Sequence, residues 1–435
     1  MKVPNVLMRM GLPLAIMVGM GEWSMALAEE GSTPRIDSGD TAWILMSSAL
    51  VLCMMLPGLA LFYGGLVRSK NVLGTIMHTA VILCLITLVW VICGYSLAFG
   101  PDVGGVIGSL EWIGLQGVGA EPSAVYATTI PHQVFMVFQL MFAAITVALI
   151  TGSFAERMNF KALLLFSVLW SVCIYSPLAH WVWGGGWLSK MGALDFAGGA
   201  VVHISSGFGA LVCAIMLGPR KGYGKEPMPP HNLPMTVLGT GLLWFGWFGF
   251  NGGSALAANG GAGGAFIATH IAAAAGGLSW MGAEWVHRGK PTVLGIASGI
   301  IAGLATITPA AGFVGPMSAI LIGLVAGTMC YVAVVWKNKL GYDDSLDVVG
   351  IHGVGGFMGI LATGLLASIG ATGLFFGNAG LFGIQVILAL VTLAFSVVGT
   401  YIILKIVDLT IGLRINAQDE EMGLDLSQHS ERAYS

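Results

Sequence analysis

Long apolar stretches separated by short polar segments fill most of this chain. A helix that crosses a bilayer needs about 20 apolar residues. The pattern predicts eleven such spans, at residues 41–64, 73–99, 132–153, 160–180, 196–217, 234–252, 263–285, 292–309, 315–336, 346–368 and 382–407. Because lipid offers no partner for free backbone groups, each span is predicted to be a helix. We therefore expect an all-α polytopic membrane protein.

The first 28 residues have the pattern of a secretory signal peptide. Lys2 and Arg9 form a positive segment before an apolar run from Met10 to Met20, and Ala26-Leu27-Ala28 is a small-residue cleavage signal. The run is too short to cross a bilayer, which favours a cleaved signal over an uncleaved anchor. The predicted organisation is a signal peptide at 1–28, a membrane domain at 29–410 and a polar tail at 411–435.

The distribution of Lys and Arg predicts how the spans are oriented. Cleavage places the mature N-terminus outside, and eleven spans then place the tail inside, as expected for a bacterial inner membrane. The outer segments of the mature chain hold only Arg35 and Lys190. The inner segments hold Arg68, Lys70, Arg157, Lys161, Arg220, Lys221, Lys225, Arg288, Lys290, Lys337, Lys339, Lys405, Arg414 and Arg432. This asymmetry follows the positive-inside rule, which an even number of spans would break.

One polar pattern occurs twice within apolar spans. Asp195, His203 and Gly207 are spaced in the same way as Asp344, His352 and Gly356, and each Gly precedes a Phe. The copies fall on spans five and ten, which cross in opposite directions. This predicts an inverted repeat of five plus five helices, with the eleventh helix extra. An ionisable group inside a membrane is costly and indicates a functional site, although each His could also be a satisfied core residue.

Composition supports a membrane protein and excludes several classes. The chain is 56% hydrophobic and 9% charged, whereas soluble domains carry roughly a quarter charged residues. No basic run suggests nucleic acid. The 6 Cys form no CxxC pair, so neither a disulfide framework nor a metal framework is expected.

Several runs along the mature chain are distinctive. They are Pro57-Gly58-Leu59-Ala60-Leu61-Phe62-Tyr63-Gly64-Gly65, Phe154-Ala155-Glu156-Arg157, Ala179-His180, Trp183-Gly184-Gly185-Gly186, Asp195-Phe196-Ala197-Gly198-Gly199 with Val201-Val202-His203, His231-Asn232-Leu233-Pro234, Gly246-Trp247-Phe248-Gly249-Phe250-Asn251, Gly350-Ile351-His352-Gly353 and Asp408-Leu409-Thr410-Ile411-Gly412-Leu413-Arg414. Together they resemble the ammonium transporter (Amt/Mep/Rh) family, in its bacterial AmtB-like branch. The likeness covers nearly all of the mature chain.

The resemblance implies a homotrimer of eleven-helix protomers, each with one conduction path for ammonium or ammonia, and neither a cofactor nor a metal. It also implies that the tail helps a cytosolic PII signal protein to block the inner mouths. The residues that match the family's site are an outer recruitment pair, Trp183 and Ser254; gate phenylalanines Phe142 and Phe250; pore histidines His203 and His352; a buried Asp195; a supporting Trp247; and vestibule aromatics Phe138 and Tyr175.

These residue types suit ammonium chemistry. Aromatic faces attract a cation, and a Ser oxygen accepts a hydrogen bond from N–H. An apolar path is costly for a bare cation, but ammonium can leave its proton behind and continue as ammonia. Two neutral imidazoles could line the path and relay the proton, giving net electrogenic uptake. Simple ammonia permeation past structural histidines is the alternative. Asp195 could be only the N-cap of span five, or a cap that also favours the cation.

Two other functions compete with transport. An ammonium sensor would bind the same ion with little flux, but such proteins often carry appended signalling domains, and the chain ends about thirty residues after its last span. A membrane enzyme with a di-histidine metal site is disfavoured, because His203 and His352 have no neighbouring carboxylate or thiol in the sequence to complete a ligand set. We therefore expect no enzymatic activity. The other seven histidines are weaker candidates, and the two that lie in spans, His78 and His270, are interpreted as structural.

Overall fold

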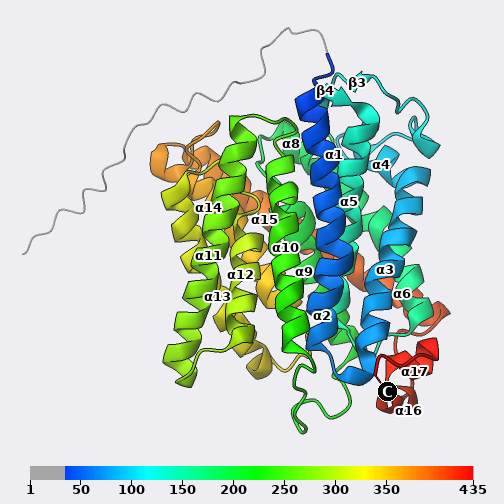
Figure 1. Cartoon of the computed structure of the whole chain (residues 1–435). Helices are drawn as coiled ribbons and strands as arrows, with labels where there is room; N and C mark the ends of the chain where they lie inside the picture. Colours follow the sequence, from blue (N-terminus) through cyan, green and yellow to red (C-terminus); the bar gives the residue numbers. More distant parts are fainter. Residues whose placement is uncertain (1–34, 435) are drawn as a thin grey trace, which may run out of the picture.

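Long helices run side by side through the molecule, as the ribbon of the computed structural model shows (Figure 1). The structure describes residues 35–434, so the predicted signal peptide lies outside the described residues. Within that range, 10 helices are long and apolar enough to cross a membrane. An eleventh apolar helix, Val293–Ile307, has 15 residues and falls at the eighth predicted span. Each predicted span therefore corresponds to an apolar helix.

The first five spans combine α-helical, 3-10 and π-helical segments. They are α1 (Ser38–Cys53), η1 (Met54–Leu59) and α2 (Ala60–Leu66); α3 (Val72–Val89), η3 (Trp90–Gly94) and α4 (Tyr95–Phe99); α5 (His132–Ile150) and η5 (Thr151–Ser153); α6 (Phe160–Trp170), η6 (Ser171–Tyr175), α7 (Ser176–Val182) and α8 (Trp187–Lys190); and η7 (Gly199–Ile204) with α9 (Ser205–Leu217).

The remaining six spans are mostly continuous. They are α10 (Leu233–Gly253), α11 (Gly260–Arg288), α12 (Val293–Ile307), α13 (Pro316–Leu340), η8 (Val349–Gly353) with α14 (Val354–Leu366), and α15 (Ala379–Thr410). The connecting and terminal elements are η2 (Ser69–Asn71), β1 (Asp102–Val103), β2 (Ile107–Gly108), η4 (Ile113–Leu115), β3 (Pro122–Ser123), β4 (Ala127–Pro131), η9 (Leu374–Phe376), α16 (Ala417–Met422) and α17 (Leu424–His429).

Short polar residues begin the later spans. The side chains of Asn232, Asn259, Thr292 and Asn378 each accept a backbone N–H in the first turn of the helix that follows. Such caps satisfy donors that the helix itself leaves free. These four polar residues therefore fix where α10, α11, α12 and α15 start.

Spans five and ten cross in opposite directions at two close approaches. A Cβ added at Gly207 would lie 2.1 Å from the backbone nitrogen of Gly353, and one added at Gly356 would lie 2.7 Å from the Cβ of His203. The residue number rises from 203 to 207 along one helix while that of the contacted residue falls from 356 to 353 along the other, so the two helices are antiparallel. This agrees with the predicted inverted repeat, and the absence of side chains lets the histidine-bearing backbones meet.

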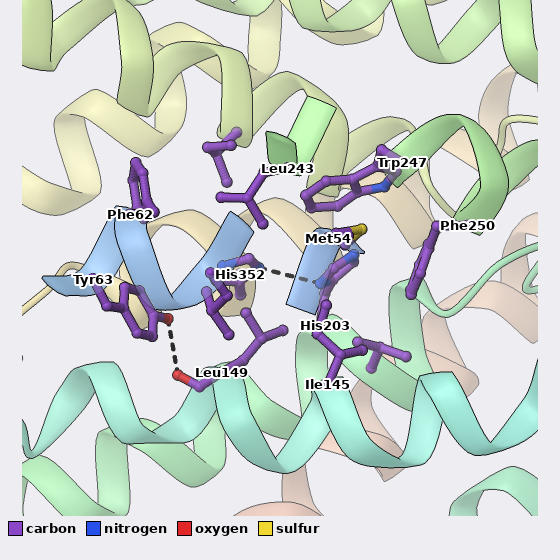
Figure 2. Close-up of a pocket in the computed structure, with 13 residues that line it drawn as sticks. Met54, Phe62, Tyr63, Ile145, Leu149, His203, Leu243, Trp247, Phe250 and His352 are labelled. Carbon is purple, nitrogen blue, oxygen red and sulfur yellow. Dashed lines mark hydrogen bonds between the residues drawn. The ribbon is translucent and has the colours of Figure 1, made fainter. Parts of the chain in front are cut away.

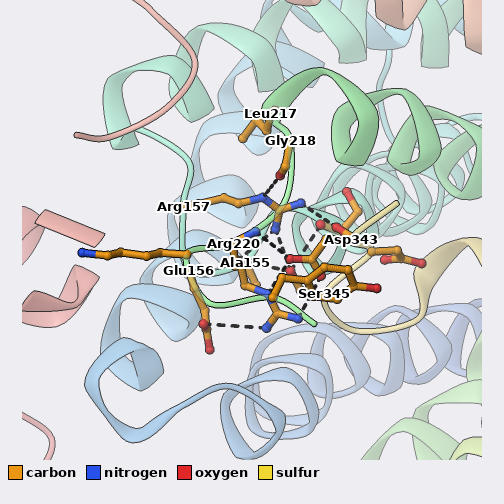
Figure 3. A network of polar contacts seen from close by, with 12 residues as sticks. Ala155, Glu156, Arg157, Leu217, Gly218, Arg220, Asp343 and Ser345 are labelled. Carbon is orange, nitrogen blue, oxygen red and sulfur yellow. Dashed lines mark hydrogen bonds and ion pairs between the residues drawn. The ribbon is translucent and has the colours of Figure 1, made fainter. Parts of the chain in front are cut away.

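The loops that precede spans four, six and ten meet in one buried polar cluster (Figure 3). The guanidinium of Arg157 donates to the carbonyls of Gly218 and Asp343, at 2.8 and 2.6 Å, and to the Ser345 hydroxyl at 2.7 Å. Arg220 holds both carboxylate oxygens of Asp343 at 2.9 Å. Burial lowers the pKa of Arg157 to about 10, so it remains charged at neutral pH.

The C-terminal segment packs against these same loops. The backbone N–H of Ile415 donates to the Arg157 carbonyl at 3.2 Å, and Arg414 donates to the Leu217 carbonyl at 2.8 Å and pairs with Glu420 at 2.7 Å. Figure 1 shows α16 and α17 against the ends of α3 and α6. Residues 411–434 are therefore docked on the loops, although a polar composition of this kind is also typical of a freely solvated chain.

Candidate substrate pathway

Each pattern histidine lies on a π-helical turn that begins near its pattern aspartate. His203 is on η7, and the carboxylate of Asp195 accepts four backbone N–H groups at the start of that helix, at 2.6 to 3.1 Å. His352 is on η8, and Asp344 accepts the N–H of Val349 at 2.8 Å. The Asp195 carboxylate therefore caps the start of η7. Asp344 keeps one buried oxygen without a partner, and burial raises its pKa to about 6.

The two histidines meet nitrogen to nitrogen. Nδ1 of His352 lies 3.2 Å from Nδ1 of His203, and the rings are nearly parallel with centroids 5.1 Å apart. His203 is fully buried and its Nε2 has no hydrogen-bond partner. A buried nitrogen without a partner is costly. A ligand that can donate or accept a hydrogen bond would remove that cost.

A narrow cavity runs past both rings (Figure 2). Its other lining residues are Met54, Leu59, Phe62, Tyr63, Ile145, Leu149, Val202, Leu243, Trp247, Phe250 and Ile301. About 10 Å³ is open to the centre of a water-sized sphere, which is room for about one molecule of that size. Apart from the histidines, the Tyr63 hydroxyl and the Trp247 indole N–H, the lining side chains are apolar.

Two stacked phenyl rings close one end of this cavity. Phe142 and Phe250 have centroids 4.2 Å apart and an interplanar angle of 23°, and Phe250 lies 6.2 Å from the His203 ring. Trp183 meets Phe142 edge-on at 5.8 Å, and Phe138 meets it edge-on at 5.0 Å. Four of the sequence-predicted aromatics thus form one group beyond His203.

The remaining predicted residues, Ser254, Trp247 and Tyr175, make separate contacts. The hydroxyl of Ser254 donates to the Phe250 carbonyl at 2.9 Å, which leaves its oxygen able to accept. Trp247 stacks on His203 at 5.5 Å, with its indole N–H held by the Thr308 hydroxyl at 2.9 Å. Tyr175 is fully buried and packs against Trp90 at 6.0 Å.

Sequence reasoning missed the other end of the cavity. Figure 2 shows Phe62 and Tyr63 at the end opposite Phe250, with His352 and His203 between. The Tyr63 hydroxyl donates to the Leu149 carbonyl at 3.0 Å. The signal was present in the sequence, because Phe62-Tyr63-Gly64-Gly65 on span one echoes Phe250-Asn251-Gly252-Gly253 on span six. In an inverted repeat, such echoes fall at opposite ends of the pathway.

The paired imidazoles have nitrogens that can donate and accept hydrogen bonds. Within residues 35–434, no group of three or more His, Cys, Asp or Glu side chains is placed to hold a metal ion. Two imidazoles in contact, with an apolar path on either side, instead suit a small neutral molecule that exchanges hydrogen bonds with nitrogen.

Known proteins of one kind resemble this chain over nearly its whole length. Residues 42–434 match the family described as the Ammonium Transporter Family. The ammonium transporter of Bacillus subtilis is 54% identical over 402 residues, which cover 91% of this chain and 98% of that protein. The crystal structure of Mep2 from Saccharomyces cerevisiae has a TM-score of 0.83 at 40% identity and covers 88% of this chain and 89% of its own. A structure titled "Sensor Amt Protein" has a TM-score of 0.84 at 30% identity, with 90% and 98% covered.

Proposed function

This chain belongs to the ammonium transporter family, a family of transporters rather than enzymes, and from that premise we propose how it moves ammonium. NH4+ is recruited at Trp183 and Ser254, loses its proton near Phe142 and Phe250, and continues as NH3 through the apolar cavity. His203 and His352 relay the proton, so net transport carries charge. The observation that carries this proposal is the Nδ1–Nδ1 contact of 3.2 Å beside the unpartnered Nε2 of His203.

The contact between the rings supports a relay because of how neutral imidazole distributes its single proton. If one Nδ1 donates to the other, the donor ring has a free lone pair at Nε2 and the acceptor ring has N–H at its Nε2. The pair then offers one acceptor and one donor nitrogen. Transfer of a proton across the pair, with its release from the far Nε2, inverts this arrangement. Protons can therefore pass while ammonia travels separately.

The aromatic group supports recruitment of a cation followed by loss of its charge. The faces of Trp183 and the two phenylalanines attract NH4+, and the Ser254 oxygen can accept one of its N–H groups. Beyond Phe250, a bare ion would lose several kcal/mol of hydration against apolar side chains. Potassium has no way to avoid this loss, whereas ammonium avoids it by deprotonation. Selectivity would thus come from acid–base chemistry.

The proposed setting is the inner membrane of a bacterium, with the N-terminus outside and the C-terminal segment in the cytoplasm. The bias of Lys and Arg between alternate loops supports this orientation. We also propose a homotrimer, which native mass spectrometry of the purified protein would test. A Cys introduced at Ser430 should react with a membrane-impermeant labelling reagent added from the cytoplasmic side. Reaction with reagent added from outside would show the reverse orientation.

The folded C-terminal segment is the proposed contact for a cytosolic PII signal protein. The Glu421 carboxylate pairs with Lys221, and the Glu421 backbone carbonyl accepts the Lys70 ammonium, so the segment and the loops form one continuous surface. Within the segment, Glu420 pairs with Arg414. Deleting the residues after Gly412 should abolish capture of the chain by immobilised PII. Capture at full strength without the segment would remove it from the proposed interface.

Electrophysiology on a solid-supported membrane tests the transport proposal directly. Proteoliposomes should give a transient current with ammonium pulses and none with potassium pulses of equal concentration. Equal signals from both ions would overturn the proposal. The neighbouring sensor structure makes a low-flux receptor the second candidate. Saturable ammonium binding without current or ammonia flux would favour that reading.

A further inference from the structure

His180 lies outside the pathway, three residues before Trp183, in the last turn of α7. Its side chain is completely buried. Nδ1 lies 3.0 Å from the carbonyl oxygen of Ala98, and Nε2 lies 2.9 Å from a carboxylate oxygen of Asp102. Both ring nitrogens therefore face an oxygen at hydrogen-bond distance.

Neither oxygen can donate a hydrogen bond. A carbonyl only accepts, and Asp102 also accepts Lys190 Nζ at 2.5 Å and the N–H of Gly105 at 2.7 Å. The hydrogen bonds from Lys190 and His180 lower the pKa of Asp102 to about 2, so it is ionised at neutral pH. Neutral imidazole has a single N–H and would set a lone pair against one of the oxygens.

We propose that His180 is a buried imidazolium whose ion pair with Asp102 positions Trp183 for ammonium recruitment. The geometry alone requires two N–H donors on this ring. Asp102 compensates the charge, and Lys190 and the Tyr126 hydroxyl are the other titratable groups around the pair. The role in recruitment rests on the proposed function, whereas the protonation state does not.

The contacts of His231, in the same protein, do not require a second ring N–H. Its Nδ1 lies 2.9 Å from the carbonyl of Val67, but its Nε2 lies 3.0 Å from the hydroxyl of Tyr434. A hydroxyl can donate, so one N–H on Nδ1 and one lone pair on Nε2 satisfy both contacts. This histidine is the matched reference for His180.

The pair fixes the turn that carries Trp183. The N–H of Gly186 donates to the His180 carbonyl at 2.9 Å. A Cβ added at Gly184 would lie 2.1 Å from the carbonyl oxygen of Ala98 and 2.7 Å from Nδ1 of His180, so the turn rests on the ring and on its acceptor. Loss of the ion pair would therefore make this turn, and with it the indole of Trp183, more mobile.

The β1–β2 hairpin closes over the turn from outside. Asp102 begins β1, and the N–H of Trp187 donates to the Gly105 carbonyl at 3.0 Å. The Tyr126 hydroxyl donates to the carbonyl of Phe99 at 2.8 Å and lies 3.3 Å from that of Gly184. Asp102 thus makes the charged contacts, to His180 and to Lys190, among the neutral hydrogen bonds between the hairpin and the segment from His180 to Lys190.

Solid-state NMR of the full chain in lipid bilayers, labelled with ¹⁵N in histidine, tests the protonation state. At pH 7, the difference spectrum between wild type and His180→Gln should show one ring with two protonated nitrogens. The difference spectrum for His231→Gln should show a neutral ring. A neutral tautomer at His180 would overturn the proposal, whether or not the protein transports ammonium. Asp102→Asn gives a second test if His180→Gln does not fold, because it should convert the His180 ring to a neutral one.

Transport measurements test the positioning role separately. In His180→Gln and in Asp102→Asn, the half-saturating ammonium concentration should rise roughly fivefold, as expected for about 1 kcal/mol of lost positioning. The maximal current should stay within about twofold, because the pore itself is unchanged. His231→Gln should alter neither quantity. An unchanged half-saturating concentration, or a loss of maximal current alone, would remove His180 from the recruitment site.

Discussion

The indole N–H of Trp183 donates to the backbone carbonyl of Asp195 at 2.8 Å. The side chain of the same aspartate receives four N–H groups from the helix that carries His203. One residue therefore anchors both the outer aromatic group and a pore histidine. A substitution of Asp195 should therefore affect the positions of both Trp183 and His203.

Asp195→Ala should destabilise the protein strongly. The substitution leaves four N–H groups without their acceptor, and loss of an N-cap alone costs about 1 kcal/mol, with more for buried donors. Asp195→Asn should cost less, because its amide oxygen still accepts. In detergent, the thermal unfolding midpoint should be highest for wild type, lower for Asp195→Asn and lowest for Asp195→Ala. If Asp195→Asn unfolds like wild type but needs far more ammonium for half-saturation, the carboxylate also favours the cation by its charge.

Trp183→Leu should weaken recruitment without opening the pore to other ions. Removing a cation–π face worth about 0.5–2 kcal/mol should raise the half-saturating ammonium concentration by roughly 2- to 30-fold. Potassium pulses should still give no current. Trp285→Leu is the matched control, because that side chain lies near the end of α11 and is 55% exposed. Equal effects of the two substitutions would argue against a recruitment site at Trp183.

Acid should loosen the loop cluster through Asp343. Burial by itself would raise the pKa of Asp343, but the hydrogen bonds and charge of Arg220 outweigh it and lower that pKa below 3.8. A carboxylate with a lowered pKa contributes stability above its ordinary value and loses it as the pH falls below that value. Through this group, the thermal midpoint should fall below about pH 4. The raised pKa of Asp344 acts in the opposite sense and should raise the midpoint as the pH falls from about 7 to 5.

Asp343→Asn should lower the midpoint at pH 7 and remove most of this acid dependence. Breaking one partner of a buried ion pair costs about 3 kcal/mol or more. Glu421→Gln is the control, since the Lys221–Glu421 pair is exposed and should contribute nothing measurable. If the thermal midpoint of Asp343→Asn fell below pH 4 as steeply as that of wild type, another carboxyl group would be responsible for the acid dependence.

Much of this fold follows from the sequence, because lipid penalises polar groups along a whole span. Hydropathy placed each apolar helix, and the spacing of Asp195 and His203 against Asp344 and His352 indicated two antiparallel helices that meet. The π-helical turns under both histidines were not predictable, since they depend on how the backbones of Gly207 and Gly353 approach. Phe62 and Tyr63 were missed because a four-residue echo carries little weight until the helices are placed.

The polar segments were harder to predict than the apolar ones. The tail from Gly412 onward looks like solvated chain by composition, yet Leu424 is fully buried and its N–H donates to Asn71 at 2.8 Å. Such docking depends on a few specific partners in distant loops. Pattern and composition do not report them.

His203→Gln and His352→Gln decide whether the paired rings relay protons. Glutamine keeps one donor and one acceptor but cannot take up a proton near neutral pH. If the relay operates, each substitution should reduce the ammonium current by tenfold or more, which corresponds to at least about 1.4 kcal/mol on the barrier. Ammonia flux, followed by the internal pH of the proteoliposomes, should fall much less, because the cavity stays open. His287→Gln, whose ring contacts Tyr331 outside this pathway, should leave both signals unchanged. An unchanged current in both pore variants would mean that the rings only shape the path, and that charge crosses by another route.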